Sequence, residues 1–354
     1  SRIEIVAGGD IRFEGESLTL ATGGQIAASA TRRSFVADKA RLDVSGAVGV
    51  NVTMESNNVK VNVQGNEMRD APRNRESGKL FNNDVWIDRR KLVRVAPGVG
   101  GYEGERWYAA GGLLEVGGYL GNQGHGIGEW AAQGGTVVLG GSEVVTQAGS
   151  KVNLSGGSLN VQTGKIYQTW LKGSDGRLYN LNSAPSDLLY DGVYKGFEAE
   201  HVRWGKANTD YFYNPLIGPQ RKLENGYTVG RDAGRLVVSA PTAVLEGDIV
   251  AEVFNGAQQT RARDAALDDG YRQSQTAVAR GGVLAVGRYG ALGRIDLFDT
   301  DVRFGDVAPV TQQMAAADAL ADERIGTLWL DAAHLNAQCL SVLDIGTRGS
   351  TTIE

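Results

Sequence analysis

The feature that most constrains this chain is an internal repeat. The segment 134–164, GGTVVLGGSEVVTQAGSKVNLSGGSLNVQTG, matches itself when it is shifted so that Val137 falls on Val152 and Leu139 on Leu154. The same shift aligns IEIVAGGDIRF at the start of the chain with LTLATGGQIAA. Self-similarity at a fixed period is typical of folds built from stacked repeats. We therefore expect a repeat architecture.

Apolar residues in these repeats follow a second rule: an apolar-x-apolar pair, four further residues, and another such pair. Alternation with period two predicts short strands with one buried face, and the Ser-Gly and Gly-Gly pairs between them predict turns. Strands of about three to five residues are too short for a hairpin sheet but can stack coil upon coil. The template fits Val152/Leu154/Leu159/Val161, Leu236/Val238/Ala243/Leu245, Ile295/Leu297/Val302/Phe304 and Leu328/Leu330/Leu335/Ala337.

This pattern favours an all-β fold, a right-handed parallel β-helix, in which glycine serves corners where the chain turns sharply, often with positive φ, and where a Cβ would cost energy at every repeat. About 200 residues would then form eight to ten coils of about 20 to 25 residues, a rod of about 40 to 50 Å. An antiparallel β-sandwich or barrel is the alternative, although the chain has few Asn-Gly or Asp-Gly hairpin signals.

Three stretches interrupt the pattern and are expected to protrude from the coils. One is charged, one holds the densest group of aromatic residues, and the third is split between two segments rich in Ala, Gln, Arg and Asp. The expected organisation is coils over 1–66, a charged excursion over 67–110, coils over 111–161, an aromatic-rich insertion over 162–233, and coils over 234–354 with short helical or loop insertions near 255–282 and 311–325.

Charge and cysteine content exclude several classes of function. The net charge is -5, the isoelectric point is near 5.4 and RRKLVR is the only basic cluster, so neither nucleic acid nor an anionic membrane has electrostatic support as a partner. No apolar run is long enough to predict a transmembrane segment. A single cysteine permits no internal disulfide, and Cys339 in AQCLSVLDIG is expected to be a small buried hydrophobe.

Familiar catalytic motifs are absent from the sequence, which has no nucleophile elbow, P-loop, HExxH or CxxC. His125 and Glu129 would suit an acid/base pair, but their glycine-rich surroundings favour a histidine exposed in a turn. The acidic ladder RIDLFDTDVRFGD would suit a β-helical carbohydrate-active enzyme or a calcium site at Asp296, Asp299 and Asp301. Aspartate is also ordinary at turns. We expect no catalytic residue, metal or cofactor.

The aromatic insertion is the most informative candidate for binding. Tyrosine and tryptophan combine a flat apolar body with a polar tip, which suits sugar rings and protein surfaces. The alternative is that these rings pack the insertion as a small core of its own. The three consecutive aromatics of TDYFYNPLIGPQ cannot all point inward in one strand. The candidate ligand-binding residues are Trp170, Tyr190, Trp204, Tyr211, Phe212 and Tyr213.

A long stretch of the chain resembles the central region of large filamentous haemagglutinin family exoproteins. The resemblance covers about residues 65–250, through segments such as NNDVWIDRRKLVRVAPGVGGYEGERWYAAGGLLEVGGYLGNQGHGIGEW, YKGFEAEHVRWG and NPLIGPQRKLENGYTVGRDAGRLVVSAPTAVLEG. It implies a β-helical shaft, Sec export and passage through an outer-membrane transporter of two-partner secretion. It further implies an adhesin secreted or displayed at the surface of a Gram-negative bacterium, with roles in virulence, biofilm cohesion or competition.

Three hypotheses follow from the sequence. The first is a non-catalytic adhesin segment whose excursions bind a host-cell, bacterial-cell or exopolysaccharide ligand. The second is a secreted β-helical lyase or glycosidase that uses outward acidic residues. The third is a structural spacer with the fold of the first and no ligand. The resemblance favours the first, and it brings no catalytic residues in this region to carry over.

Overall fold

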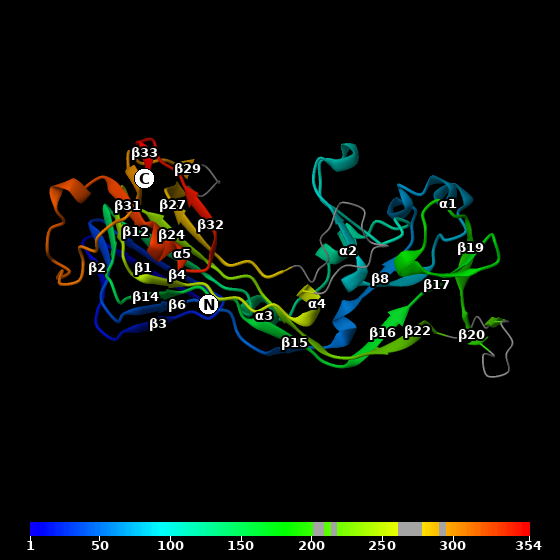
Figure 1. The fold of residues 1–354 in the computed structure, drawn as a ribbon. Helices are drawn as coiled ribbons and strands as arrows, with labels where there is room; N and C mark the ends of the chain where they lie inside the picture. The colour runs from blue at the N-terminus through cyan, green and yellow to red at the C-terminus, as the bar shows by residue number, and fades with distance from the viewer. Residues whose placement is uncertain (201–208, 214–217, 261–277, 290–294) are drawn as a thin grey trace.

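The computed structural model describes residues 1–200, 209–213, 218–260, 278–289 and 295–354, with the backbone alone for 196–200, 209–213, 288–289 and 295–296. The molecule is elongated and has two parts (Figure 1). One part holds three parallel sheets and both chain ends, and the other is built from antiparallel strands. The protein is all-β in class, and no sheet closes into a barrel within the described residues.

The first part consists of three parallel sheets, here called A, B and C. In spatial order, sheet A contains β1 (Arg2–Ala7), β4 (Gln25–Ala30), β12 (Thr136–Gly140), β24 (Arg235–Ser239), β27 (Gly282–Val286) and β32 (Leu340–Ile345). Sheet B contains β2 (Ile11–Phe13), β5 (Arg33–Val36), β13 (Glu143–Thr146), β25 (Thr242–Leu245), β31 (Thr327–Asp331), β30 (Asp301–Gly305) and β33 (Thr351–Ile353). Sheet C contains β26 (Asp248–Val250), β14 (Lys151–Asn153), β6 (Arg41–Asp43) and β3 (Leu18–Leu20).

The chain passes through sheets A, B and C in turn four times, as β1–β3, β4–β6, β12–β14 and β24–β26. Equivalent residues of successive passes are in register across the parallel pairs. Their inward side chains form one continuous core, in which Ile26, Val137, Leu236 and Leu284 are fully or almost fully buried. The expected inward positions of Val152 and Leu154 are confirmed, and the antiparallel alternative does not describe these sheets.

The period of the sequence repeat is not the length of one pass. The repeat relates Val137 in sheet A to Val152 in sheet C of the same pass. A full pass is longer, because the first one runs from Ile3 to its parallel partner Ile26. Only four passes contribute a strand to each of the three sheets, whereas eight to ten coils were expected. The number is smaller because much of the chain pairs outside sheets A, B and C.

Beyond the fourth pass the strand order departs from a simple stack. β31 lies between β25 and β30 in sheet B, although β30 precedes it in sequence. The connecting segment 306–326, here called the strap, contains the 3-10 turn η8 (Asp322–Arg324) and no α-helix. Leu320, Met314 and Ala316 of the strap cover Phe35, Val145 and Val244, so β5, β13 and β25 of sheet B are buried on both faces. The insertion expected near 311–325 is therefore a packed loop.

Arg33 fastens the strap to sheet B, and its replacement tests this role. Its guanidinium donates to Glu143 Oε2 at 2.7 Å and to the carbonyls of Ala316 and Asp318 at 3.1 and 2.6 Å. The Arg33→Ala substitution should lower the free energy of unfolding by about 2 to 4 kcal/mol, because it leaves a carboxylate and two carbonyls without their donor. Hydrogen exchange of strap amides should accelerate, whereas the exposed Arg41→Ala control should change neither quantity. Unchanged exchange would contradict the fastening role.

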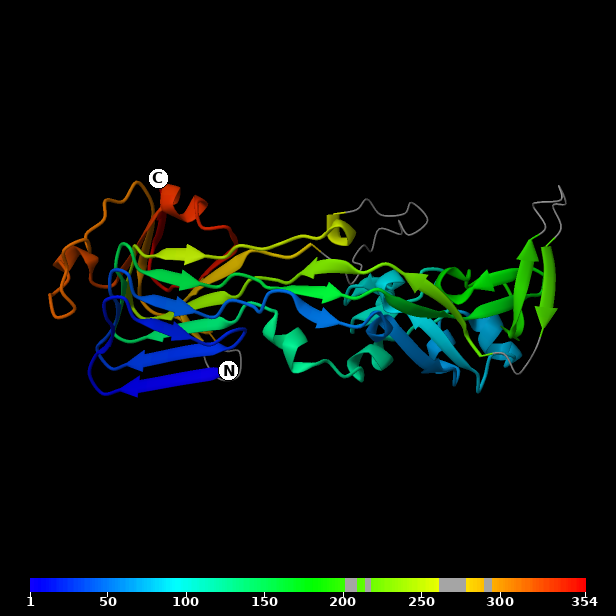
Figure 2. The ribbon, with the colours of Figure 1, turned by 90° about the horizontal axis from the view of Figure 1, so that it is seen from below.

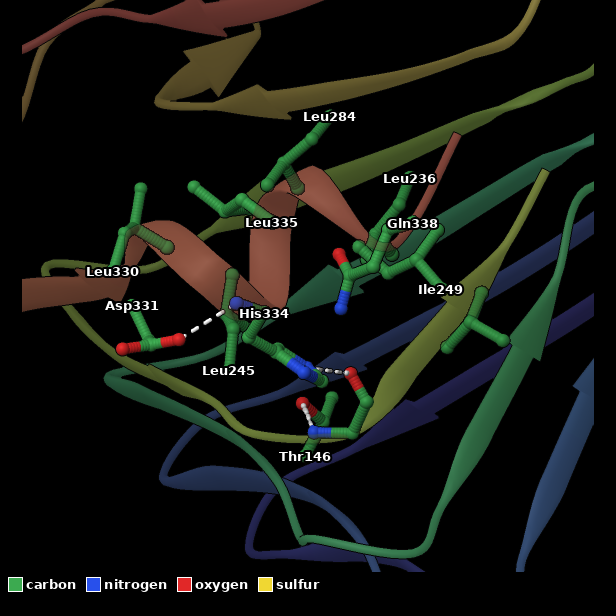
Figure 3. A pocket seen from close by; sticks show the side chains of 12 residues that line it. Thr146, Leu236, Leu245, Ile249, Leu284, Leu330, Asp331, His334, Leu335 and Gln338 are labelled. Atoms are coloured by element: carbon green, nitrogen blue, oxygen red, sulfur yellow. Dashed lines mark hydrogen bonds between the residues drawn. The ribbon is translucent and has the colours of Figure 1, made fainter. Parts of the chain in front are cut away.

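A short helix, α5 (Ala332–Asn336), packs against the interior beside the last strand of sheet C. His334, Leu335 and Gln338 face Leu236, Ile249 and Leu284 across a cavity (Figure 3). His334 Nε2 lies 3.2 Å from the Gly247 carbonyl oxygen, and its amide donates to Asp331 Oδ1 at 2.6 Å, which caps the helix. The cavity volume is about 10 Å³, room for one water.

Two expectations for this end of the chain are wrong. Leu335 and Ala337 lie in or directly after α5 and not in a strand, because Asp331 caps a helical turn at the position where the template expected a corner. Cys339 is exposed and not buried, since it occupies a left-handed turn with φ of 52° between α5 and β32.

The second part of the molecule is here called the insertion unit, residues 53–123 and 162–226. Its strands pair antiparallel: β8 (Asn58–Asn62) with β9 (Asp84–Asp88), β10 (Val93–Val95) with β11 (Arg106–Tyr108), β16 (Gly164–Gln168) with β22 (Gln220–Glu224), β17 (Trp170–Gly173) with β18 (Leu178–Asn180) and β19 (Tyr190–Tyr194), and β20 (Gly196–Glu200) with β21 (Thr209–Tyr213). Its helical elements are η1 (Met54–Asn57), η2 (Asn66–Met68), α1 (Pro72–Ser77), η3 (Arg89–Lys91), η4 (Val99–Gly101), α2 (Gly117–Gly121) and η5 (Leu181–Ser183).

A small mixed sheet joins the two parts. β15 (Ser158–Val161) pairs parallel with β7 (Val50–Val52) and antiparallel with β23 (Tyr227–Gly230). The helix α3 (Ile127–Ala131) lies near β15 where the two parts meet (Figure 1). Figure 2 shows the long ribbons of this region running from one part into the other. Two further short elements follow: α4 (Ala257–Thr260), and the antiparallel pair β28 (Arg288–Tyr289) and β29 (Ile295–Asp296).

The two expected excursions fold as one unit with a shared core. Buried residues from Val59 to Val116 and from Leu171 to Tyr190 belong to a single cluster. The chain leaves sheets A, B and C after β6 and enters the insertion unit after β7 of the mixed sheet, which ends at Val52 and not at residue 66. Sheet A resumes at Thr136, not at 111. Val59, Val61 and Val63 alternate with the same period as the coil strands, so periodicity does not reveal that they pair elsewhere.

Candidate functional site

The structure describes the side chains of two of the six candidate binding residues. Trp204 lies outside the described residues. Tyr211, Phe212 and Tyr213 lie in β21, for which the backbone pairing with β20 is described and the side chains are not. Only Trp170 and Tyr190 have described side chains, and they have different environments.

Tyr190 is a core residue and not a surface contact. It is fully buried, its hydroxyl donates to the Pro185 carbonyl at 2.8 Å, and its ring lies edge-on to Tyr179 with centroids 5.8 Å apart. Burial raises the pKa of Tyr190 above its usual value, with Tyr179 and two aspartates adding to the effect. The expectation that Tyr190 contacts ligand is wrong, because the ring fills the interior of the insertion unit. For this residue the small-core alternative holds.

Trp170 lines an open cleft of about 420 Å³ in the insertion unit, here called the aromatic cleft. Three other half-buried aromatic residues, Trp86, Tyr167 and Tyr194, line it with Trp170. The rings of Trp86 and Tyr167 contact each other with centroids 4.7 Å apart and planes tilted by 42°. Clefts of about 300 to 1,000 Å³ with aromatic walls are typical small-molecule or sugar sites.

Strand alternation explains why these rings reach the cleft. In β9, Val85 and Ile87 are buried in the unit's core, so Trp86 between them points to the other face. The amide of Trp86 donates to Thr169 Oγ1 at 2.8 Å, which joins β9 to the start of β17. Two segments far apart in sequence are thereby held together at the cleft. In β17, Trp170 similarly precedes the fully buried Leu171.

Charged side chains surround the aromatic walls. Lys60 Nζ lies 2.7 Å from Asp84 Oδ2, and both residues are exposed. The hydrogen bond from Lys60, with a second from Asn62, lowers the pKa of Asp84 below its usual value. The guanidinium of Arg221 lies 5.1 Å from the ring centroid of Tyr167, within cation–π range. The cleft therefore offers flat apolar walls with donors and acceptors beside them.

One polar atom of a residue that lines the cleft has no partner. Trp170 Nε1 is buried from solvent and makes no hydrogen bond within the described structure. A buried indole N–H normally has an acceptor, and leaving one unpaired costs about 1 to 3 kcal/mol.

The sequence identifies the aromatic insertion but not the cleft. Trp86 is not predicted as a binding residue from the sequence, because it lies in the charged excursion and not in the aromatic insertion. The alternation in DVWID is the one signal that distinguishes it from Val85 and Ile87. Tyr167 and Tyr194 belong to the aromatic insertion, but nothing local distinguishes them from the buried Tyr190. Their convergence depends on strand pairings that the sequence pattern does not encode.

The other candidates form no larger constellation among the residues described. His125 Nδ1 lies 3.0 Å from Glu129 Oε2, and His125 is half-buried where an exposed turn residue was expected. Asp299 contacts Arg348 at 3.1 Å. Asp301 Oδ1 accepts from the Ser350 hydroxyl at 2.7 Å and from the Ser350 amide at 2.8 Å, and these two hydrogen bonds lower the pKa of Asp301. The side chain of Asp296 is not described. In the described part of the chain, no three acidic, histidine or cysteine side chains gather as metal ligands.

The chain matches no protein-family model, no curated protein and no solved structure. Among the residues that the structure describes, no helix combines the length and apolar character needed to cross a membrane.

Proposed function

We propose that this chain is a non-catalytic segment of a large secreted, surface-displayed bacterial adhesin, and that its aromatic cleft binds a carbohydrate. The observation that carries the proposal is the convergence of four aromatic side chains from separate strands on one open cleft of a rigid unit. The resemblance to filamentous haemagglutinin exoproteins supports the same class. In that class the chain would be exported through an outer-membrane two-partner transporter.

The stacked sheets suit a shaft. Parallel strands that repeat in register around one apolar interior support a right-handed parallel β-helix, in which each coil contacts only its neighbours. A chain that crosses a membrane unfolded benefits from having no disulfide, and coils that pair onto earlier coils can form progressively. The insertion unit would then project a binding surface from the side of the shaft.

The chemistry of the cleft suits a sugar in particular. Pyranose rings present flat C–H faces that pack on aromatic rings, and their hydroxyls bond to polar groups at the edges. Trp86 and Trp170 supply the apolar faces, and Lys60, Asp84 and Arg221 supply polar contacts. The ligand would be a host-cell, neighbouring-cell or exopolysaccharide glycan.

Tryptophan substitution in the full chain tests the cleft. Glycan-array screening should find saturable binding, and Trp86→Ala or Trp170→Ala should each weaken it about tenfold or more, because removing a central aromatic contact costs at least about 1.4 kcal/mol. Trp130→Ala is the matched control, since Trp130 is an exposed tryptophan outside the cleft. A triple change of Tyr211, Phe212 and Tyr213 to Ala examines the remaining candidates separately.

The possible results distinguish the three hypotheses. Binding that survives both cleft substitutions but is lost in the triple variant would move the site to β21. Absence of any glycan or cell binding would favour the structural spacer. Polysaccharide cleavage by the chain that is lost on Asp299→Ala would favour the enzyme and overturn the proposal.

A further inference from the structure

A second pocket lies at the junction of the two parts of the molecule, away from the aromatic cleft. It is formed between η3, α3 and the mixed sheet of β7, β15 and β23, and its volume is about 160 Å³. Three arginines, Arg89, Arg90 and Arg231, line it together with one carboxylate, Glu129. This pocket, here called the arginine pocket, concentrates positive charge in a chain whose net charge is -5.

The three arginines differ in how they are neutralised. Arg90 is satisfied locally, because its Nε and a terminal nitrogen donate to the two carboxylate oxygens of Asp88 at 2.9 and 2.8 Å. Arg89 and Arg231 have no comparable partner: the Nε of each is buried without a hydrogen bond, and neither forms an ion pair within the described structure. A buried guanidinium N–H without an acceptor is costly. Two such groups at one pocket call for an explanation.

The electrostatics show that the pocket lacks negative charge. Burial lowers the pKa of Arg89, Glu129 opposes this effect, and the positive charge of Arg231 adds to it. Glu129 is already engaged by His125 Nδ1 at 3.0 Å and by the Gly126 amide. Arg90 is matched by Asp88, and Glu224, 3.8 Å from Arg90, is paired with Lys222 at 2.8 Å. Arg89 and Arg231 are then left with the one carboxylate of Glu129, an excess of one positive charge when His125 is neutral.

Apolar side chains form one side of the lining, and Ser56, Asn57 and Tyr227 also contribute to it. Leu159 and Val161 are buried at the pocket, Val52 and Val229 line it beside them, and Trp130 stands exposed at the same pocket with its ring 5.7 Å from that of His125. A ligand must therefore combine one negative charge with an apolar body. A volume of about 160 Å³ limits it to roughly the size of a single aromatic acid.

We propose that the arginine pocket binds a small organic carboxylate, with its carboxylate on Arg89 and Arg231 and its apolar body against Leu159, Val161 and Trp130. Guanidinium forks match the geometry of a carboxylate and form strong charge-assisted hydrogen bonds with it. A monoanion balances the excess charge, whereas a phosphate dianion would exceed it. The site is separate from the aromatic cleft and does not depend on its proposed function.

Calorimetry on the full chain tests this site with benzoate as the probe. Benzoate should bind with a dissociation constant below about 1 mM, and Arg89→Gln or Arg231→Gln should weaken it about tenfold or more. Arg89→Lys keeps the positive charge and should therefore reduce benzoate affinity less than Arg89→Gln does. Arg41→Gln, at an exposed residue of β6, and Trp170→Ala in the aromatic cleft are controls that should leave benzoate affinity unchanged.

Three other ligands separate the contribution of the negative charge from that of the apolar body. Benzamide has the apolar body without the charge and should not bind measurably, acetate lacks the body and should bind about tenfold more weakly than benzoate, and inorganic phosphate should also bind more weakly. The proposal would be overturned if benzamide bound as tightly as benzoate or if phosphate bound more tightly than benzoate. It would also be overturned if benzoate gave no saturable heat at about 10 mM, roughly ten times the expected upper limit of its dissociation constant.

Direct observation of the wild-type chain covers the case in which a glutamine variant fails to fold. Proton–nitrogen spectra should show the Nε–H resonances of Arg89 and Arg231 and the indole N–H of Trp130 moving together as benzoate is added. Shifts confined to Trp86 and Trp170 would place the ligand in the aromatic cleft and overturn the assignment.

Discussion

The Gly135→Ala substitution is expected to lower the free energy of unfolding by about 3 kcal/mol or more, at the upper end of what overpacking costs. A Cβ on Gly135 would lie 2.1 Å from the carbonyl oxygen of Gly24 and 2.9 Å from Cβ of Val44. These contacts are with backbone and buried side-chain atoms that cannot rotate away, so neighbouring passes of the chain must separate. Overpacking typically costs about 1 to 3 kcal/mol, and here it also strains the hydrogen bond from the Thr136 amide to Gly24.

Gly8→Ala is the matched control for this measurement. Gly8 follows β1, has no positive φ and has no atom within 4 Å of the position that an added methyl group would take, so alanine should be neutral or slightly stabilising there. Chemical denaturation of both variants gives the comparison. A difference below about 0.5 kcal/mol would contradict the close-packed corner, because surface substitutions alone vary by that amount.

Close approach, and not left-handed backbone, explains the glycines at this corner. A Cβ on Gly24 would meet the Ser1 carbonyl oxygen at 2.1 Å, and one on Gly234 would meet that of Gly135 at 1.8 Å, so each glycine admits the backbone of the preceding pass. None of these three glycines has a positive φ. Positive φ does apply to Gly149, at 90°, which lies before β14. The positive φ often expected at corners therefore occurs at some turns and not at this one, whereas the expected cost of a Cβ holds at all three of these glycines.

The sequence predicts the parallel sheets well because their signal is local. Two-residue alternation at Val152 and Leu154 places both side chains inward whichever coil they join, and the structure buries both. The sequence overestimates the number of passes because alternation at Val59 and Val61 has the same form. Both residues lie in β8, which pairs with β9, and the periodicity of a strand does not reveal a pairing partner far away in sequence. The insertion of β31 between β25 and β30 is hidden for the same reason.

The candidate sites are harder to predict than the fold. Aromatic density identifies the insertion, but whether a ring is buried or faces a cleft depends on which strand covers it. Tyr190 and Trp170 lie on paired strands of one sheet, yet Tyr190 is in the core and Trp170 lines the cleft. The arginine pocket draws Arg89, Glu129 and Arg231 from three distant segments. In sequence, each looks like an ordinary solvated charge.

The Tyr190→Ala substitution should remove about 3 to 5 kcal/mol of stability from the insertion unit, the usual cost of truncating a buried aromatic residue. Tyr190 is fully buried in the core shared by both segments of the unit, so truncation leaves a large cavity and removes its contact with Tyr179. Hydrogen exchange should accelerate at amides of β8 and β17 together, because the two strands bury side chains in that one core. Exchange in β12 of sheet A should change far less.

Two further variants separate packing from the hydroxyl. Tyr190→Phe keeps the ring and loses only the bond to the Pro185 carbonyl, so it should cost about 1 kcal/mol. Leu223→Ala changes an exposed residue of the same unit and should cost less than about 0.5 kcal/mol. If Tyr190→Ala accelerates exchange in β17 but leaves β8 unchanged, the two segments do not share a cooperative core, and the aromatic cleft between them loses its rigid support. Acceleration in both strands would instead show that residues 53–123 and 162–226 fold as one body, which is the condition for Trp86 and Trp170 to act on the same ligand.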